Sequence, residues 1–123
     1  MIQLDTNFLI QALVAGSIPE TRLVDWLSTG EQVGISAIAW SEFLCGPLAP
    51  RDEFLARSFL KPPDAFLAQD ARRAAELFNL TGRRSRSLAD CQIAAVALRV
   101  GARVATTNVA DFGPFQAHGL VLA

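Results

Sequence analysis

The stretch from Ser87 to Pro114, SLADCQIAAVALRVGARVATTNVADFGP, constrains the fold of this chain more than any other segment. Apolar residues recur at helical spacing between Ile93 and Val100, and Gly101 stands where a left-handed residue ends a helix. A short β-prone run from Arg103 to Thr106 follows directly. We therefore predict a helix, a glycine stop, a strand and an acidic turn, which is the order that builds a parallel α/β sheet.

An acid occupies an unusual place in this stretch. Ser87 and Asp90 have the spacing of a capping box, but Asp90 also extends the apolar stripe of the helix by one turn, where a charge is costly without a partner. One explanation is that Asp90 only favours the helix macrodipole, by roughly 0.3–1 kcal/mol. The other is a site, because similarly placed acids recur at Asp5, Glu42 and Asp111, beside the ends of predicted strands.

The remaining chain repeats the alternation of strands and helices. We expect short strands at 2–4, 32–35, 103–106 and 119–122, and helices following residue 6 and at 19–29, 37–45, 51–60, 64–81 and 88–100. Thr6 or Asn7 is expected to cap the first helix. This order predicts an α/β fold with a mainly parallel central sheet and helices on both faces, in a single domain over residues 1–123.

Composition narrows the possible functions. No apolar run approaches the roughly 20 residues that span a bilayer, and MIQLDTNFLI lacks the basic start of a signal peptide, so we expect a cytoplasmic protein. The only histidine, His118, argues against an imidazole metal site or a Ser/His triad, so any metal would be held by oxygen. A net charge of −1 argues against nucleic-acid binding by bulk positive charge. A local patch remains open: Arg83, Arg84 and Arg86 precede the helix of Asp90, and guanidinium groups match phosphate geometry, although a solvated loop is an equal interpretation.

The four acids have the chemistry of a cation site. The carboxyl ends of parallel strands meet at one edge, where ligands bind in open α/β sheets, so Asp5, Glu42, Asp90 and Asp111 are expected to form one acidic pocket. Taken singly, Asp5 is equally well explained as a helix cap, and a solvated position is the default interpretation for Glu42. Mg²⁺ and Mn²⁺ prefer such oxygen ligands, and a site of this kind hydrolyses phosphodiesters without a histidine.

Four segments together resemble a known family. They are LDTNFLI at 4–10, SAIAWSEFLCG at 36–46, LADCQIAAVAL at 88–98 and ATTNVADF at 105–112. In this order they resemble the PIN domain, and within it the VapC-type toxins of type II toxin–antitoxin pairs. The resemblance implies a Mg²⁺- or Mn²⁺-dependent endoribonuclease that cuts RNA, a homodimer, and an antitoxin partner whose tail occludes the pocket.

The same resemblance implies roles for individual residues. Asp5, Glu42 and Asp90 match the acids of the metal site, and Thr6 and Thr106 match supporting hydroxyl groups. The family's last acid stands either at position 108 or at position 111; here these are Asn108 and Asp111, which favours Asp111 as the ligand and Asn108 as its neutral neighbour. Thr107 stands where an arginine is frequent in the family, so the phosphate contact that this arginine could make is not expected here.

Two other functions compete with this interpretation. A phosphotransfer domain, either a haloacid-dehalogenase-like phosphatase or a receiver, also uses an Asp after a strand. The phosphatase needs a second Asp where this chain has Asn7, and both need a lysine near the phosphoryl group, whereas the only lysine is Lys61. A binding module that kept the fold without catalysis is the third possibility, and metal-dependent RNA cleavage separates it from the first.

Overall fold

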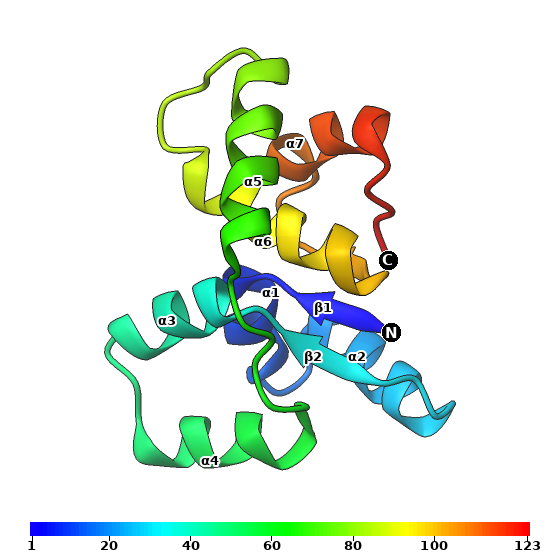
Figure 1. Ribbon diagram of the computed structural model, residues 1–123. Helices are drawn as coiled ribbons and strands as arrows, with labels where there is room; N and C mark the ends of the chain where they lie inside the picture. Colours follow the sequence, from blue (N-terminus) through cyan, green and yellow to red (C-terminus); the bar gives the residue numbers. More distant parts are fainter.

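Three short parallel strands form the centre of the computed structural model, which describes residues 1–123 (Figure 1). They are β1 (Ile2–Leu4), β2 (Val33–Ile35) and β3 (Arg103–Ala105), in the order β2-β1-β3. Leu4 lies opposite Ile35 on one side and Ala105 on the other. Since helices cover both faces of such a sheet, its strands are buried at every position except Arg103, which is half-buried, and the buried amide of Gln3 donates to the Asp64 carboxylate at 2.6 Å. The predicted α/β class and mainly parallel sheet are confirmed.

Seven α-helices and a 3₁₀-helix surround the sheet. They are α1 (Thr6–Ala12), α2 (Ile18–Ser28), α3 (Ala37–Cys45), α4 (Pro50–Phe59), α5 (Ala68–Leu80), α6 (Leu88–Val100), α7 (Val109–Phe112) and η1 (Gly113–His118). Figure 1 shows α5 and α6 side by side above the sheet, with α1 and α2 on its other side and α4 below α3. None of these helices has both the length and the apolar character needed to cross a membrane.

The helix α6 is the most buried helix of the molecule. The consecutive residues from Ile93 to Ala97 are all buried, as is Cys91, so the helix is covered nearly all round rather than on one stripe. Gly101 ends it with φ of 71°, the left-handed conformation that a glycine adopts without strain. The predicted glycine stop is confirmed. The strand β3 then begins two residues later, which carries the chain back under the helix.

An ion pair ties α5 to α6. Asp70 is almost completely buried, and its carboxylate accepts hydrogen bonds from Arg99 Nε at 2.9 and 3.1 Å. Asp70 also accepts from the backbone N–H of Leu67 at 2.8 Å and so caps its own helix. Arg99 donates a further bond to the carbonyl of Ala65 at 2.7 Å. Both charges are therefore hydrogen-bonded, which is what a buried pair requires.

Four local predictions need correction. Asp5, not Thr6 or Asn7, caps α1. Ser87 precedes α6 without a side-chain cap, because its hydroxyl donates to the Arg84 carbonyl at 2.8 Å instead.

The C-terminal part differs in two further ways. The segment 119–122 is not a strand but a single parallel bridge between Leu122 and Val104, in which Val104 N–H donates to the Val121 carbonyl at 2.9 Å. The 3₁₀-helix η1 occupies the residues directly before this segment. Asp111 lies in the short helix α7 rather than in a loop. Phe112 and Phe115 are buried and meet edge to face at 5.8 Å, which fixes this helix on the core.

Candidate active site

Asp5 is the most constrained of the acids at the edge of the sheet where the carboxyl ends of the strands meet. It directly follows β1, is only 4% exposed, and its backbone N–H donates to the Ala105 carbonyl at 3.0 Å. Its Oδ1 accepts from the Phe8 N–H at 2.7 Å and its Oδ2 from the Thr106 hydroxyl at 2.5 Å. Asp5 thus serves as a helix cap and remains a candidate ligand, because each carboxylate oxygen keeps a second lone pair.

Glu42 reaches the same edge from α3. Ser36 follows β2 and caps that helix through a bond from Ala39 N–H at 3.1 Å, which sets the direction of the helix. The Thr6 hydroxyl then donates to Glu42 Oε1 at 2.9 Å and lies 3.3 Å from the Ala39 carbonyl. One hydroxyl therefore holds the starts of α1 and α3 together and points Glu42 toward Asp5.

Asp90 closes the group from the first turn of α6. A small cavity of about 100 Å³ is lined by Asp5, Thr6, Asn7, Glu42, Asp90 and Ile93. We call this the acid pocket. Its size admits an ion with a few waters rather than an organic cofactor. Elements from three distant parts of the chain thus present carboxylates to one small volume.

The electrostatics of the acid pocket are those of crowded like charges. The pKa of Asp90 is raised to about 6, first by burial and then by the charges of Asp111, Glu42 and Asp5 in that order, while Arg84 opposes them. Burial also raises the pKa of Asp5 above its ordinary value; hydrogen bonds from Thr106 and Phe8 counteract this and the Glu42 charge adds to it. Asp90 accepts no hydrogen bond from the protein, so nothing but Arg84 offsets its charge.

Asp111 lies beside the acid pocket without lining it. Its Oδ2 accepts from Asn108 Nδ2 at 2.6 Å. The Asn108 backbone N–H in turn donates to the Thr106 hydroxyl at 2.9 Å, the same hydroxyl that binds Asp5. Asn108 is therefore the neighbour that connects Asp111 to Asp5. The structure brings three of the four predicted acids to the cavity and leaves the fourth at its border.

The three arginines of the 83–86 segment do not act alike. Arg84 reaches Asp111, with Nη2 3.0 Å from its carbonyl and Nη1 3.9 Å from its carboxylate. Arg83 instead donates to Asn79 and lies over the Phe78 ring at 5.4 Å, so it faces α5. Arg86 is exposed. Of the predicted phosphate-binding residues, only Arg84 approaches the acids.

A divalent cation fits the acid pocket in donor chemistry. The available donors are carboxylate oxygens, with hydroxyl groups around them, and hard cations prefer such ligands. The acids do not form a ready cage, since no group of three or more His, Cys, Asp or Glu side chains is arranged to hold a metal ion. Burial first, and then the neighbouring acids, make the charged form of Asp90 unfavourable, and a bound cation would offset both effects. Asp5, Glu42 and Asp90 are the residues that would hold the ion.

Asn7 is the pocket residue that sequence reasoning treated only as a cap. It lines the acid pocket from the first turn of α1. The signal was available in its position two residues after Asp5, directly behind a strand. A carboxamide there supplies a neutral donor and acceptor among the acids.

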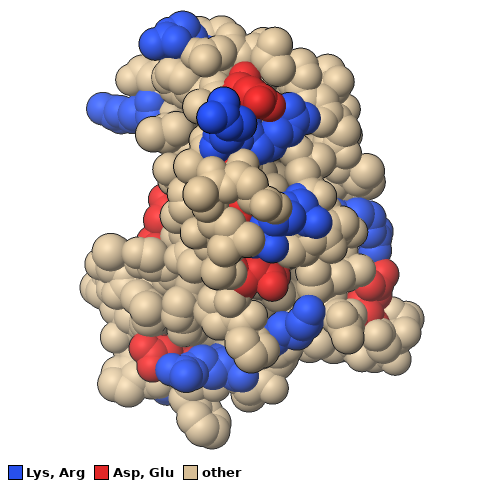
Figure 2. Space-filling model, viewed as in Figure 1, with Lys and Arg blue, Asp and Glu red and all other residues tan.

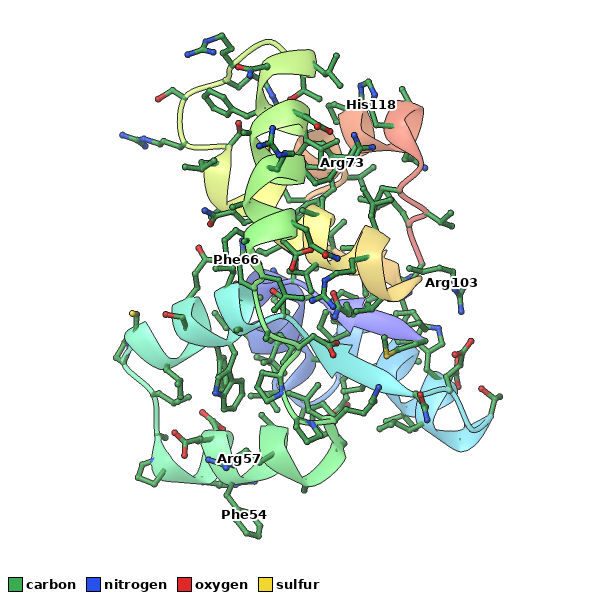
Figure 3. The ribbon with its side chains drawn as sticks, viewed as in Figure 1. Phe54, Arg57, Phe66, Arg73, Arg103 and His118 are labelled. Carbon is green, nitrogen blue, oxygen red and sulfur yellow. The ribbon has the colours of Figure 1, made fainter.

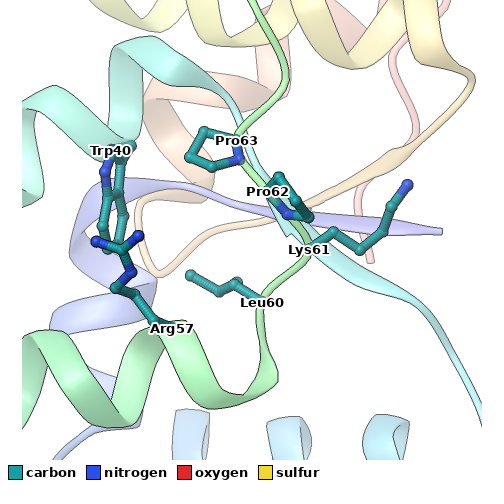
Figure 4. A pocket seen from close by; sticks show the side chains of 6 residues that line it. All are labelled: Trp40, Arg57, Leu60, Lys61, Pro62 and Pro63. Carbon is teal, nitrogen blue, oxygen red and sulfur yellow. The ribbon is translucent and has the colours of Figure 1, made fainter.

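Two larger hollows lie outside the acid pocket. One, of about 380 Å³, is lined by Phe8, Gln11, Ser17, Ile18, Pro19, Arg22, Thr106 and Thr107. The other, of about 210 Å³, lies between α3, α4 and the segment 60–63, as Figure 4 shows, and contains Lys61. The only lysine of the chain therefore lines a different cavity from the acids.

Comparison with known families identifies the fold. The family model of the PIN domain matches residues 2–112, which includes all four acids. The chain belongs to the PIN domain family. No curated protein matches it.

Solved structures agree with this membership of the PIN domain family. The chain is similar to the VapBC2 structure from Rickettsia felis bound to a promoter DNA fragment, with a TM-score of 0.77 and 20% identity over 100% of this chain and 98% of that one. A toxin–antitoxin complex from Klebsiella pneumoniae has a TM-score of 0.73 and 25% identity over 91% and 90%. Mycobacterium tuberculosis VapC20, a toxin that cleaves the sarcin–ricin loop, has a TM-score of 0.67 and 18% identity over 100% and 98%. The chain therefore shares the fold of VapC-type structures, in agreement with the resemblance seen in its sequence.

Proposed function

We propose that this PIN domain is a metal-dependent endoribonuclease and the toxin of a toxin–antitoxin pair, acting as one domain in the cytoplasm. The observation that carries the proposal is the acid pocket. Asp5, Glu42 and Asp90 come from three different parts of the chain, and the pKa values of Asp5 and Asp90 are raised. No lysine or arginine side chain lines the pocket to offset these charges. Perturbed acids in a small cavity are typical of a functional site.

The chain's own residues prepare this pocket for a phosphodiester. Thr106 and the Phe8 N–H fix the orientation of Asp5, and Thr6 fixes that of Glu42, so the side chains need little reordering. Arg84 at the border supplies a guanidinium for a backbone phosphate. Bound Mg²⁺ or Mn²⁺ supplies the Lewis acidity that phosphodiester hydrolysis needs. The absence of a lysine from the pocket disfavours a phosphatase or receiver function.

The decisive experiment compares the parent protein with Asp90→Asn on single-stranded RNA. We expect cleavage by the parent in Mg²⁺ or Mn²⁺, none in EDTA, and a loss of at least a hundredfold in Asp90→Asn, because the amide keeps the shape but removes a ligand charge. The products should carry 5′-phosphates. Glu31→Gln is a matched control, since Glu31 pairs with Arg103 and the chain's amino group at the amino-terminal end of the strands, whereas the acid pocket lies at their carboxyl end. Equal activity of Asp90→Asn and the parent, or a 2′,3′-cyclic phosphate product, would contradict the proposal.

The proposal includes protein partners. Two of the similar structures are a VapBC2 assembly and a toxin–antitoxin complex, which supports an antitoxin for this chain. A basic side chain from such a partner can pair with the acid pocket in place of a metal. We expect the native protein to co-purify as a homodimer with a small protein encoded by a neighbouring gene. A lone monomer recovered repeatedly from the native host would overturn this part.

A further inference from the structure

The cavity between α3, α4 and the segment 60–63 has the composition of a nucleotide-binding pocket. Its lining consists of Trp40, Arg57, Leu60, Lys61, Pro62 and Pro63. Figure 4 shows Trp40 descending from α3, Arg57 rising from α4, and the two prolines opposite the indole. We call it the Trp40 pocket. An indole and two proline rings offer flat apolar surfaces, and two cations stand at the same opening, a combination suited to a planar ring that carries negative charge.

The two cations are available to a ligand. Arg57 has one acidic neighbour, Glu53, at 3.9 Å, and its side chain is 70% exposed, so this pair contributes little. The Lys61 ammonium has no acidic partner and contacts only the neutral sulfur of Met1, at 3.3 Å. Figure 2 shows basic side chains dispersed over this face and interrupted by acidic ones, so the attraction is local to the pocket rather than a broad field.

The pocket is rigid before any ligand binds. Lys61 N–H donates to the Val33 carbonyl at 3.0 Å and Asp64 N–H to the Ile35 carbonyl at 2.9 Å, which binds the 61–64 segment along β2. Pro62 and Pro63 have a fixed φ. The Phe43 ring supports Trp40 at a centroid distance of 5.3 Å. Little entropy is therefore lost when a ring enters.

Size decides how much of a ligand the pocket takes. Sites for drug-sized ligands or cofactors span about 300–1,000 Å³, whereas this cavity has about 210 Å³. One base fits this space, but a dinucleotide cofactor does not. A base on Trp40 leaves its phosphate near the mouth, where Arg57 and Lys61 lie.

The helix α3 connects the Trp40 pocket to the acid pocket. Trp40 and Glu42 are two positions apart and so point to opposite flanks of the helix, on either side of its buried face at Ala39 and Phe43. The exposed Ser41 lies between them on the solvent side. Since a helix with its side chains is about 10–12 Å across, a strand of a few nucleotides crossing Ser41 can reach both pockets.

We infer that the Trp40 pocket binds one nucleotide of a single-stranded RNA a few residues away from the phosphate held at the acid pocket. This inference deepens the proposed ribonuclease function and rests on it for the identity of the strand. The chemistry alone also suits a free nucleotide, and a protein segment is the competing macromolecule, since Phe54 on α4 is 77% exposed and points away from the molecule in Figure 3.

The two tryptophans of the chain make a direct test possible. In Trp26→Phe, only Trp40 emits fluorescence, and in Trp40→Phe, only Trp26 does. The Trp26 ring is stacked on Phe8 with a centroid distance of 5.6 Å, and it does not line the Trp40 pocket. Both variants are titrated in EDTA, where RNA stays intact, with a short single-stranded RNA, with uridine and adenosine monophosphates, and with inorganic phosphate. We expect RNA to quench Trp40 but not Trp26, mononucleotides to do so at higher concentration, and phosphate to have no effect.

Affinity measurements complete the test. Trp40→Leu should bind RNA about tenfold more weakly, the scale of one lost base stack. Arg57→Ala and Lys61→Ala should reduce the salt dependence of binding. Both change exposed or half-exposed side chains, so they serve even where Trp40→Leu or Trp26→Phe fails to fold. Arg51→Ala, on the same helix but outside the pocket, is the matched control.

The outcomes separate this inference from the proposed function. Quenching by mononucleotides without RNA binding, full quenching by phosphate, or unchanged RNA affinity in both Arg57→Ala and Lys61→Ala would overturn the inference. If the native protein partner binds without displacing RNA from Trp40, the inference is supported. If a segment of the partner occupies the Trp40 pocket and RNA does not, the inference is overturned. A parent that cleaves RNA with no response at Trp40 refutes the pocket alone. A response at Trp40 without cleavage refutes the nuclease and leaves nucleotide binding intact.

Discussion

At the scale of single residues, the acids of the pocket differ in what their charges cost. Asp5 and Glu42 receive hydrogen bonds from Thr106, Phe8 and Thr6, while Asp90 receives none from the protein. The sequence predicted that these acids share a sheet edge, because strand ends and a family resemblance are visible in it. It did not reveal which acid would be left without donors, because that depends on the positions of hydroxyl groups from other elements.

Asp90 should lower the free energy of unfolding of the metal-free protein as the pH rises from about 4 to 6. Its pKa is raised from 3.8 to about 6 in the folded protein, so the folded state binds the proton more tightly and loses that advantage between pH 4 and 6. Asp90→Asn has no such loss. Without metal, its free energy of unfolding should match the parent near pH 4 and exceed it by about 1 kcal/mol above pH 6.5, a scale reduced for solvent screening.

Urea unfolding in EDTA at pH 4 to 7.5 measures this difference. Asp5→Asn is the comparison variant: it removes a charge too, but it also converts an acceptor of the Thr106 hydroxyl into a donor, so its gain should be smaller or negative. A constant difference between the parent and Asp90→Asn across this pH range would show that neither burial nor the neighbouring acids raise the pKa of Asp90.

At the scale of elements, the sequence predicted helices and strands best where the capping and stop residues lie next to the element in the chain. Gly101 after α6, Ser36 before α3 and Gly46 with Pro47 after it are short-range signals, and the structure follows them. The failures arose where distant parts of the chain decide. The hydroxyl of Ser87 donates to the carbonyl of Arg84 rather than capping α6. Asp111 lies in the helix α7 rather than in the predicted loop, because the buried Phe112 and Phe115 hold this helix on the core.

The pair of Asp70 and Arg99 should dominate the attachment of α5 to α6. Arg99→Ala would leave Asp70 buried, at 2% side-chain exposure, with its charge unpaired, so we expect a loss of about 3 kcal/mol in the free energy of unfolding. Arg57→Ala removes an arginine from an exposed pair and should change it by less than about 0.5 kcal/mol. Chemical denaturation of both variants at pH 7 measures the contrast, and equal small losses would mean that water reaches Asp70 in the native state.

At the scale of the whole molecule, the sheet explains why the acids are near one another at all. Parallel pairing of β1 with β2 and β3 places Asp5, Ser36 and Thr106 at one edge, and Thr6 then joins α1 to α3. The strands are only three residues long, so the edge is close to every part of the core. The fold thus gathers negative charge at a point that apolar packing, rather than the acids themselves, keeps in place.

Cation binding should therefore reverse a stability ranking. The folded parent presents three carboxylates that the unfolded chain disperses, so a cation binds the folded state preferentially and stabilises it by about 2.7 kcal/mol at a hundred times its dissociation constant. Asp90→Asn has lost one of these ligands and should gain much less, although it is the more stable protein in EDTA.

Melting curves of parent and variant, each in EDTA, in Mg²⁺ and in Mn²⁺, test this without any assay of cleavage. The exposed variant Glu53→Gln on α4 controls for general effects of ionic strength, because divalent salts also screen surface charge. Equal shifts in all three proteins would mean that the cation acts by screening. A shift confined to the parent and Glu53→Gln would assign it to the acid pocket, since only Asp90→Asn lacks one of the three converging charges.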